Sequence, residues 1–336
     1  MLVSTPHFGT ASAVISIMSP NSPLLSPQTA HRPFKRILIA VDPGGASSKA
    51  VSYAAHLCSA QTQVLVMGIF EDPKAYLLPH SATPADVREA FEELKNDELA
   101  SLETARSTLR STGAQVHLRL LGPALGNLEI STQLARTARD WDADLIVVGA
   151  ERTAGVISLL ATKVSAVLAE HTHRAILVVP GDADESTLRP AKRLLFAVDG
   201  SDAALHAVRV GLRLAPPHAR LLALFVEDRG IDLAQLRQFL VSPTFDSRTA
   251  DHAVEQAKAV MAEGNPGMTI ESLVSHTRLT EDVACAIKRE AHDWRADIVV
   301  VGAEDRNGMF SWFRGHENER VAREIDRPLL VVNVAQ

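Results

Sequence analysis

A chain of 336 residues is long enough for two domains of ordinary size, each with its own core. Its 46% hydrophobic and 22% charged residues are typical of a soluble globular protein. The net charge is only -6 and no long basic run occurs, so we expect no nucleic-acid partner and no membrane binding. Two cysteines, Cys58 and Cys285, are too few for a disulfide framework and favour a reduced, cytoplasmic location.

The N-terminal segment, residues 1–33, differs in composition from the rest of the chain. No Asp, Glu, Lys or Arg occurs from Met1 to Ala30, while serine and proline recur. A secretory signal would place a basic residue before its apolar stretch, and this segment has none. We expect a disordered extension here. An over-long gene start, with Met18 as the initiator, is the alternative.

In the first half, five short apolar runs are predicted to be strands, because such nearly continuous runs suit parallel strands buried on both faces. They are Arg36–Asp42, Gln63–Phe70, Gln115–Leu121, Asp144–Ala150 and Ala175–Val179. Thr83-Pro84-x-Asp86 predicts the start of a helix, with an N-cap, a proline at the first helical position and an acidic first turn. Apolar residues then recur at helical spacing from Val87 to Leu109.

The second half repeats the first. Asp140–Glu151 and Asp293–Glu304 agree at nine of twelve positions, at an offset of 153 residues, and Ile37–Asp42 matches Leu194–Asp199 at an offset of 157. Strands are therefore also predicted at Arg193–Asp199, Arg220–Val226, Thr269–Val274, Asp297–Ala303 and Pro328–Val334.

The repeat predicts two tandem domains, at 34–180 and 192–336, joined by an acidic, turn-rich linker at 181–191. Each domain is expected to be an open, five-stranded parallel sheet, doubly wound with four crossover helices, in the α/β class.

In such a sheet a ligand binds outside the carboxyl ends of the strands. Asp42 and Asp199 close the first strand of each half, and Gly149 and Gly302 close the fourth. The aspartates could hold a ribose or a base edge, or they could cap the next helix, a role also expected of Ser47. The glycines are expected to serve tight turns.

These residues resemble the universal stress protein family, whose fold is that of the adenine nucleotide alpha hydrolases. Its members carry an aspartate at the end of strand 1. The nucleotide-binding members also carry Gly-x-x-Gly, nine residues, then Gly-Ser or Gly-Thr after strand 4. The resemblance covers nearly everything from Lys35 to the C-terminus, in both halves.

Both copies depart from that phosphate motif. The first runs from Gly149 to Arg152 and, after nine residues, reaches Thr162-Lys163; the second runs from Gly302 to Asp305 and reaches Gly315-His316. A side chain at a glycine position crowds the space where a phosphate would contact backbone N–H groups. We therefore expect degenerate sites, with Gly302, Gly315 and His316 the candidates in the second half.

In the first half, Arg152 and Lys163 could pair with phosphates by charge. The resemblance implies a non-catalytic stress-response protein that binds ATP or AMP, with magnesium if ATP, or another small anionic ligand, weakly or in one domain only. Slow ATP hydrolysis and a ligand-free interaction scaffold are the alternatives.

The resemblance also implies that the two domains pair as an internal pseudo-dimer through their fifth strands, at Val178-Val179 and Val331-Val332. Such pairing would hide two apolar strand edges from water, and further pairing into a homodimer is possible. No metal site is expected, because His316 stands among scattered carboxylates without a second histidine or cysteine. Trp141 and Trp294 precede strand 4 in each half and are expected to pack at the opposite end of the sheet from the ligand.

Overall fold

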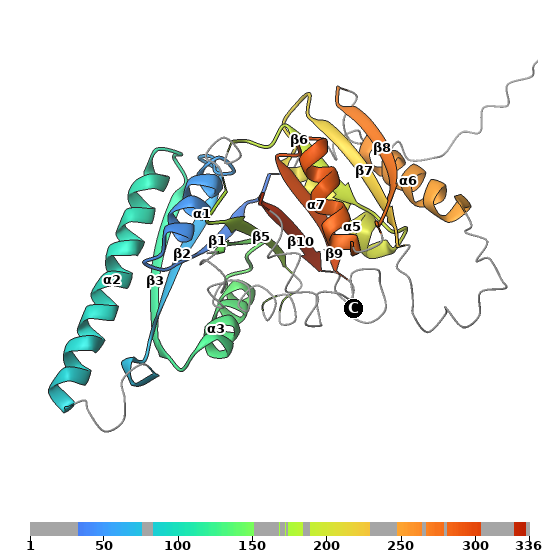
Figure 1. Ribbon diagram of the computed structural model, residues 1–336. Helices are drawn as coiled ribbons and strands as arrows, with labels where there is room; N and C mark the ends of the chain where they lie inside the picture. Colours follow the sequence, from blue (N-terminus) through green and yellow to red (C-terminus); the bar gives the residue numbers. More distant parts are fainter. Residues whose placement is uncertain are drawn as a thin grey trace, which may run out of the picture.

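The computed structural model describes residues 33–75, 83–150, 168, 172, 174–183, 189–228, 247–263, 267–278, 281–303 and 326–333. Its ten strands form one continuous sheet in the order β3-β2-β1-β4-β5-β10-β9-β6-β7-β8 (Figure 1). Neighbouring strands within each half are parallel, and the pair that joins the halves is antiparallel. The two predicted sheets are thus halves of a single sheet.

All ten predicted strands are present, with slightly different ends. The first half contains β1 (Arg36–Val41), β2 (Gln63–Glu71), β3 (Gln115–Ala124), β4 (Leu145–Ala150) and β5 (Ala175–Pro180). The second half contains β6 (Arg193–Ala197), β7 (Arg220–Glu227), β8 (Thr269–His276), β9 (Ile298–Ala303) and β10 (Leu329–Asn333). Inner strands such as β5 are buried along their whole length, whereas the edge strands β3 and β8 are largely exposed. Burial on both faces explains the continuous apolar runs of the inner strands.

Helices cover both faces of the sheet, which confirms the doubly wound architecture. They are α1 (Gly45–Ala55), α2 (Pro84–Arg110), α3 (Asn127–Asp140), α5 (Asp202–Gly211), α6 (Ser247–Ala262) and α7 (Val283–Asp293). Residues of α1, α2, α5 and α6 share one hydrophobic core, and residues of α3 and α7 share the other. The fourth crossover helix expected in each half falls outside the described residues. None of the described helices is long and apolar enough to cross a membrane.

The predicted start of α2 is confirmed in detail. Thr83 accepts a hydrogen bond from the Asp86 N–H, Asp86 accepts one from the Thr83 N–H, and Pro84 opens the helix. This capping box satisfies backbone donors that the first turn leaves without intrahelical partners. It fixes where the long helix begins, and so which of its residues face the sheet.

The two halves meet where β5 pairs with β10, as expected for an internal pseudo-dimer. Val178 lies opposite Leu329, Leu177 opposite Leu330, and Ile176 opposite Val331. All these side chains are at most 4% exposed. The pairing therefore removes two apolar strand edges from water.

Polar contacts beside this seam also join the halves. Arg213 Nη2 lies 2.7 Å from Asp144 Oδ2, and its guanidinium stacks 3.9 Å from the Phe34 ring. On β10, Asn333 Nδ2 donates to the Thr172 carbonyl at 2.9 Å in a buried position. These directional contacts fix the relative position of the halves.

If the halves fold as one unit, Leu330→Asp should destabilise the whole chain. Leu330 is fully buried, and an unpaired charge in such a site costs roughly 3–5 kcal/mol. We expect one cooperative urea transition at a lower midpoint, by circular dichroism. Leu273→Asp is the matched control, because that leucine on edge strand β8 is 36% exposed. A transition in which only part of the signal shifts would contradict a shared unit.

Candidate functional site

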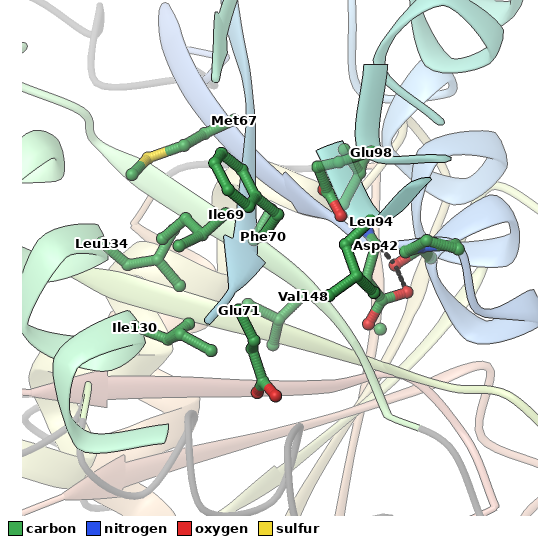
Figure 2. Close-up of a pocket in the computed structure, with 15 residues that line it drawn as sticks. Asp42, Met67, Ile69, Phe70, Glu71, Leu94, Glu98, Ile130, Leu134 and Val148 are labelled. Atoms are coloured by element: carbon green, nitrogen blue, oxygen red, sulfur yellow. Dashed lines mark hydrogen bonds between the residues drawn. The ribbon is translucent and has the colours of Figure 1, made fainter. Parts of the chain in front are cut away.

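A pocket opens at the carboxyl ends of β1, β2 and β4 in the first half, between α2 and α3 (Figure 2). Its volume is about 250 Å³. Most of its wall is apolar and comes from Met67, Ile69, Phe70, Leu94, Ile130, Leu134 and Val148. Its polar side chains are Asp42, Ser47, Glu71 and Glu98, and no Lys, Arg or His is among the described residues that line it. This is the edge of the sheet where the fold places a ligand.

Asp42 holds the loop that forms one wall of the pocket. Its Oδ1 accepts hydrogen bonds from the Gly44 N–H at 2.8 Å and from the Ser47 hydroxyl at 2.6 Å. The Ser47 oxygen in turn accepts from the Asp42 N–H at 3.0 Å. The N-cap of α1 is Gly44, without a side-chain cap. The capping roles considered for Asp42 and Ser47 are therefore wrong, because Gly44 is the N-cap and the Asp42 side chain, before the helix, is bonded to that of Ser47 in the first turn.

Asp199 plays a related part in the second half. Its Oδ1 accepts from the Ser201 N–H at 2.9 Å, and Ser201, the N-cap of α5, accepts from the Ala204 N–H at 3.1 Å. The capping alternative is wrong here as well, since the serine supplies the cap. Both aspartates stabilise the loop after the first strand of their half, and Asp42 also lines the pocket.

Gly149 and Gly302 were expected in tight turns, but both lie inside strands, β4 and β9. A Cβ on Gly149 would lie 2.5 Å from the Ala46 carbonyl carbon, and one on Gly302 would lie 2.6 Å from the Ala203 carbonyl oxygen. Each glycine thus lets the first turn of the neighbouring helix, α1 or α5, approach the strand. The reason for glycine is close packing of backbone on backbone and not a turn conformation.

Glu98 is a pocket residue that the sequence analysis missed. It lies on α2 with only 3% of its surface exposed, one turn before the buried Leu102 and two turns before the buried Ala105. The helical spacing that runs from Val87 to Leu109 places position 98 on the same apolar face. A glutamate at a core-facing position was the signal that could have found it.

The carboxyl of Glu98 lies over Gly68 of β2. A Cβ at Gly68 would come within 2.4 Å of Glu98 Oε1, so glycine makes the space that the carboxyl occupies. Oε1 is buried and has no hydrogen-bond partner among the described residues. Leaving such a group unpaired costs about 1–3 kcal/mol, unless a water or a ligand group supplies the bond.

Burial raises the pKa of the Glu98 carboxyl to about 8, and the nearby charge of Asp42 adds to the rise, while the Ile69 N–H opposes it. Glu98 is therefore mostly neutral at pH 7. Burial also raises the pKa of Glu71, which lies apart from Glu98 in Figure 2. Carboxyls of raised pKa in an apolar cavity are a common sign of a functional site.

Four of the predicted site residues, Arg152, Lys163, Gly315 and His316, lie outside the described residues. Within the described part of the chain, no group of three or more His, Cys, Asp or Glu could hold a metal ion. Trp294 packs as expected: the guanidinium of Arg193, at the start of β6, lies 4.6 Å from its ring centroid. That is the amino end of the strands, away from the site.

The profile of the Universal stress protein family matches this chain twice, at residues 33–180 and 190–333. The chain belongs to the universal stress protein family. A curated universal stress protein from Mycolicibacterium smegmatis is 24% identical over 306 residues, which cover 88% of this chain and 96% of the relative.

Two further relatives agree. One from Thermus aquaticus, described as "Universal stress protein in QAH/OAS sulfhydrylase 3'region", is 30% identical over 145 residues, which are 42% of this chain and 98% of the relative. The crystal structure of a universal stress protein from Archaeoglobus fulgidus DSM 4304 superposes with a TM-score of 0.58 at 15% identity, covering 89% of this chain and 98% of its own. The two-domain universal stress protein fold thus extends along most of the chain.

The packing of Gly149 and Gly302 predicts that alanine at either position destabilises the fold. A new Cβ would overlap helix backbone, and overpacking of this kind costs about 1–3 kcal/mol. Urea unfolding measures the loss. Gly267→Ala is the control, because its nearest neighbour, His218 Nδ1, would lie 3.4 Å away. If all three variants were equally stable, close packing would not be the reason for glycine.

The raised pKa of Glu98 predicts a pH-dependent stability that Glu98→Gln removes. Between pH 4.5, the ordinary pKa of a glutamate, and about pH 8 the folded chain holds a proton that the unfolded chain releases. Wild-type stability should therefore fall with rising pH, relative to the variant, by up to about 1.4 kcal/mol per pH unit. Urea unfolding at several pH values tests this. Glu89→Gln, on the exposed side of α2, should track wild type, and parallel curves for Glu98→Gln would refute an ionisable buried carboxyl.

Proposed function

We propose that this universal stress protein binds an adenine nucleotide, ATP or AMP, in its first domain, and that it acts in the stress response by binding and not by catalysis. We place the first domain at 34–180, the linker at 181–191 and the second domain at 192–336. The observation that carries the proposal is the pocket at the carboxyl ends of β1, β2 and β4.

The composition of the pocket suits the base better than the phosphates. Apolar side chains from β2, α2 and α3 form a slot for a flat ring, and Asp42 stands at its edge, where a ribose or a base edge can be bonded. The charge of Asp42 would repel phosphates held beside it, and no Lys or Arg among the described lining residues would offset that repulsion. We therefore propose that the phosphates point toward the segment that follows β4 in the sequence, where Arg152 and Lys163 supply positive charge.

The second domain differs where β7 corresponds to β2. Ile37 pairs with Val64 in the first half, and its counterpart Leu194 pairs with Leu221 in the second. Four residues further along, β2 has Gly68 and β7 has Phe225, a ring that is 5% exposed in the hydrophobic core. A phenylalanine fills space that glycine leaves to a pocket-lining side chain, which supports the first domain as the site.

A binding role without catalysis is supported by the pocket's polar groups. The Ser47 hydroxyl donates to the Asp42 carboxyl, and no His or Lys that could activate it as a nucleophile is among the described residues that line the pocket. The carboxyls that remain, Glu71 and Glu98, both have raised pKa values because of burial, which disfavours the ionised form that a cation would need.

A pocket-filling variant tests the site. Ile130 on α3 lines the pocket, and Ile130→Trp should abolish the rise in melting temperature that millimolar AMP or ATP with Mg²⁺ gives wild type. Ligand at about 100 times its dissociation constant adds roughly 2.7 kcal/mol of stability, a rise of a few degrees. Val283→Trp, at the corresponding position on α7, should keep that rise.

Other results would overturn the proposal in different ways. No rise with any nucleotide in wild type would favour an interaction scaffold. Loss of the rise in Val283→Trp alone would place the site in the second domain. Release of inorganic phosphate from ATP by wild type, absent in Ile130→Trp, would make the chain an ATPase.

A further inference from the structure

Glu98 occupies a position that the second domain fills with alanine. The buried residues Leu102, Ala105 and Leu109 of α2 have the same spacing as the buried residues Val254, Ala257 and Met261 of α6. One turn earlier the two helices carry Glu98 and Ala250, both buried.

The residues on the strands beneath these helices differ in the opposite direction: where the helix carries the larger side chain, the strand carries the smaller one. In the first domain the glutamate Glu98 on the helix lies over Gly68, which has no side chain. In the second domain the helix has Ala250 and the strand has Phe225. In the first domain the Glu98 carboxyl occupies the space above Gly68, and in the second Ala250 and Phe225 belong to one hydrophobic core. Only the first domain puts a carboxyl at this position. The polar group is thus specific to the domain with the pocket described above, and the duplicated fold does not require it.

Other acids lie near this carboxyl or line the same pocket. Asp42 approaches it from the loop after β1, Asp97 precedes it on the same helix, and Glu71 lines the same pocket from the end of β2. No cation is among the described residues that line the pocket. Burial in an apolar wall beside a carboxylate disfavours a second negative charge. Glu98 is therefore held in the neutral form, with Oε1 unpartnered at the wall of the pocket.

A neutral carboxyl offers a pattern that a carboxylate does not. It presents one O–H donor beside one acceptor, whereas the ionised form only accepts. Adenine carries a ring nitrogen acceptor next to an amino donor, which is the match for the neutral form; the amide of glutamine makes the same pair of bonds to adenine. Guanine offers two adjacent donors on its Watson–Crick edge, which match the ionised form.

We infer that Glu98 is a specificity-determining residue, whose neutral carboxyl selects a ligand base with an adjacent acceptor and donor in the first-domain pocket. This inference rests on the proposed function, because it concerns the same pocket. The ligand would then contact a residue of α2 as well as the loop residue Asp42 and the strand-end residue Gly149. Binding also depends on pH, since ionisation of Glu98 removes the donor.

The test measures adenosine binding by calorimetry at pH 6.5 and pH 9. Adenosine is the probe because it lacks phosphates that would titrate near this range. With a carboxyl pKa of about 8, the neutral fraction falls to about a tenth at pH 9, so the dissociation constant of wild type should rise about tenfold. Glu98→Gln keeps a donor beside an acceptor without titrating, so it should bind adenosine equally at both pH values.

Two more variants isolate the residue. Glu71→Gln removes the other pocket carboxyl with a raised pKa and should retain the pH dependence. Gly68→Phe combined with Glu98→Ala installs the second-domain pattern, which is already compatible with this fold, and should lose adenosine binding. Melting temperatures at pH 6.5 verify that each variant is folded.

The outcomes separate this inference from the proposed function. No adenosine or AMP binding by wild type at pH 6.5 would overturn both. Binding that is equal at the two pH values in wild type, or that weakens equally in wild type and Glu98→Gln, would overturn the role of Glu98 and leave the site standing. Loss of the pH dependence in Glu71→Gln would assign it to Glu71 instead.

Discussion

The antiparallel pairing of β5 with β10 is the interaction on which the rest of the structure depends. It turns two open parallel sheets into one, and it buries two apolar strands that would otherwise be exposed edges. Both hydrophobic cores continue across it, since each includes residues of both halves. Strands are parallel within each half and antiparallel at the seam. The carboxyl ends of the first-half strands therefore point to one side of the sheet and those of the second-half strands to the opposite side. The two candidate sites therefore share a scaffold without sharing a wall, and each could change independently.

The first-domain site shows how small residues create a polar cavity in such a scaffold. Gly149 lets the start of α1 approach β4, so that Ser47 in the first turn of the helix and Asp42 in the preceding loop both line the pocket. Gly68 makes room for the carboxyl of Glu98 on the facing helix. In the second domain the glycine of the strand end is kept at Gly302, while Phe225 stands where Gly68 would be. The glycine that packs against a helix, Gly149 or Gly302, is thus present in both domains, whereas the glycine under Glu98, Gly68, is present only in the domain with the pocket.

Much of the fold followed from sequence because its signals are local or repeated. Apolar runs predicted all ten strands, and the capping box marked the start of α2. The roles of the glycines and aspartates were less predictable, because they depend on which backbone lies nearby in space. Gly149 reads as a turn residue in sequence, and only its distance to Ala46 shows that it packs against a helix. Glu98 interrupts an apolar helical face, but its meaning depends on Gly68, thirty positions away, lying beneath it in the sheet.

A crystal structure of the full chain grown with AMP at pH 6.5 tests the central claim most directly. The account predicts electron density for the base between α2 and α3 of the first domain, with a ring nitrogen and the amino group within hydrogen-bond distance of the Glu98 carboxyl. Density at the carboxyl ends of the second-domain strands instead, or a base that makes no contact with Glu98, would contradict it.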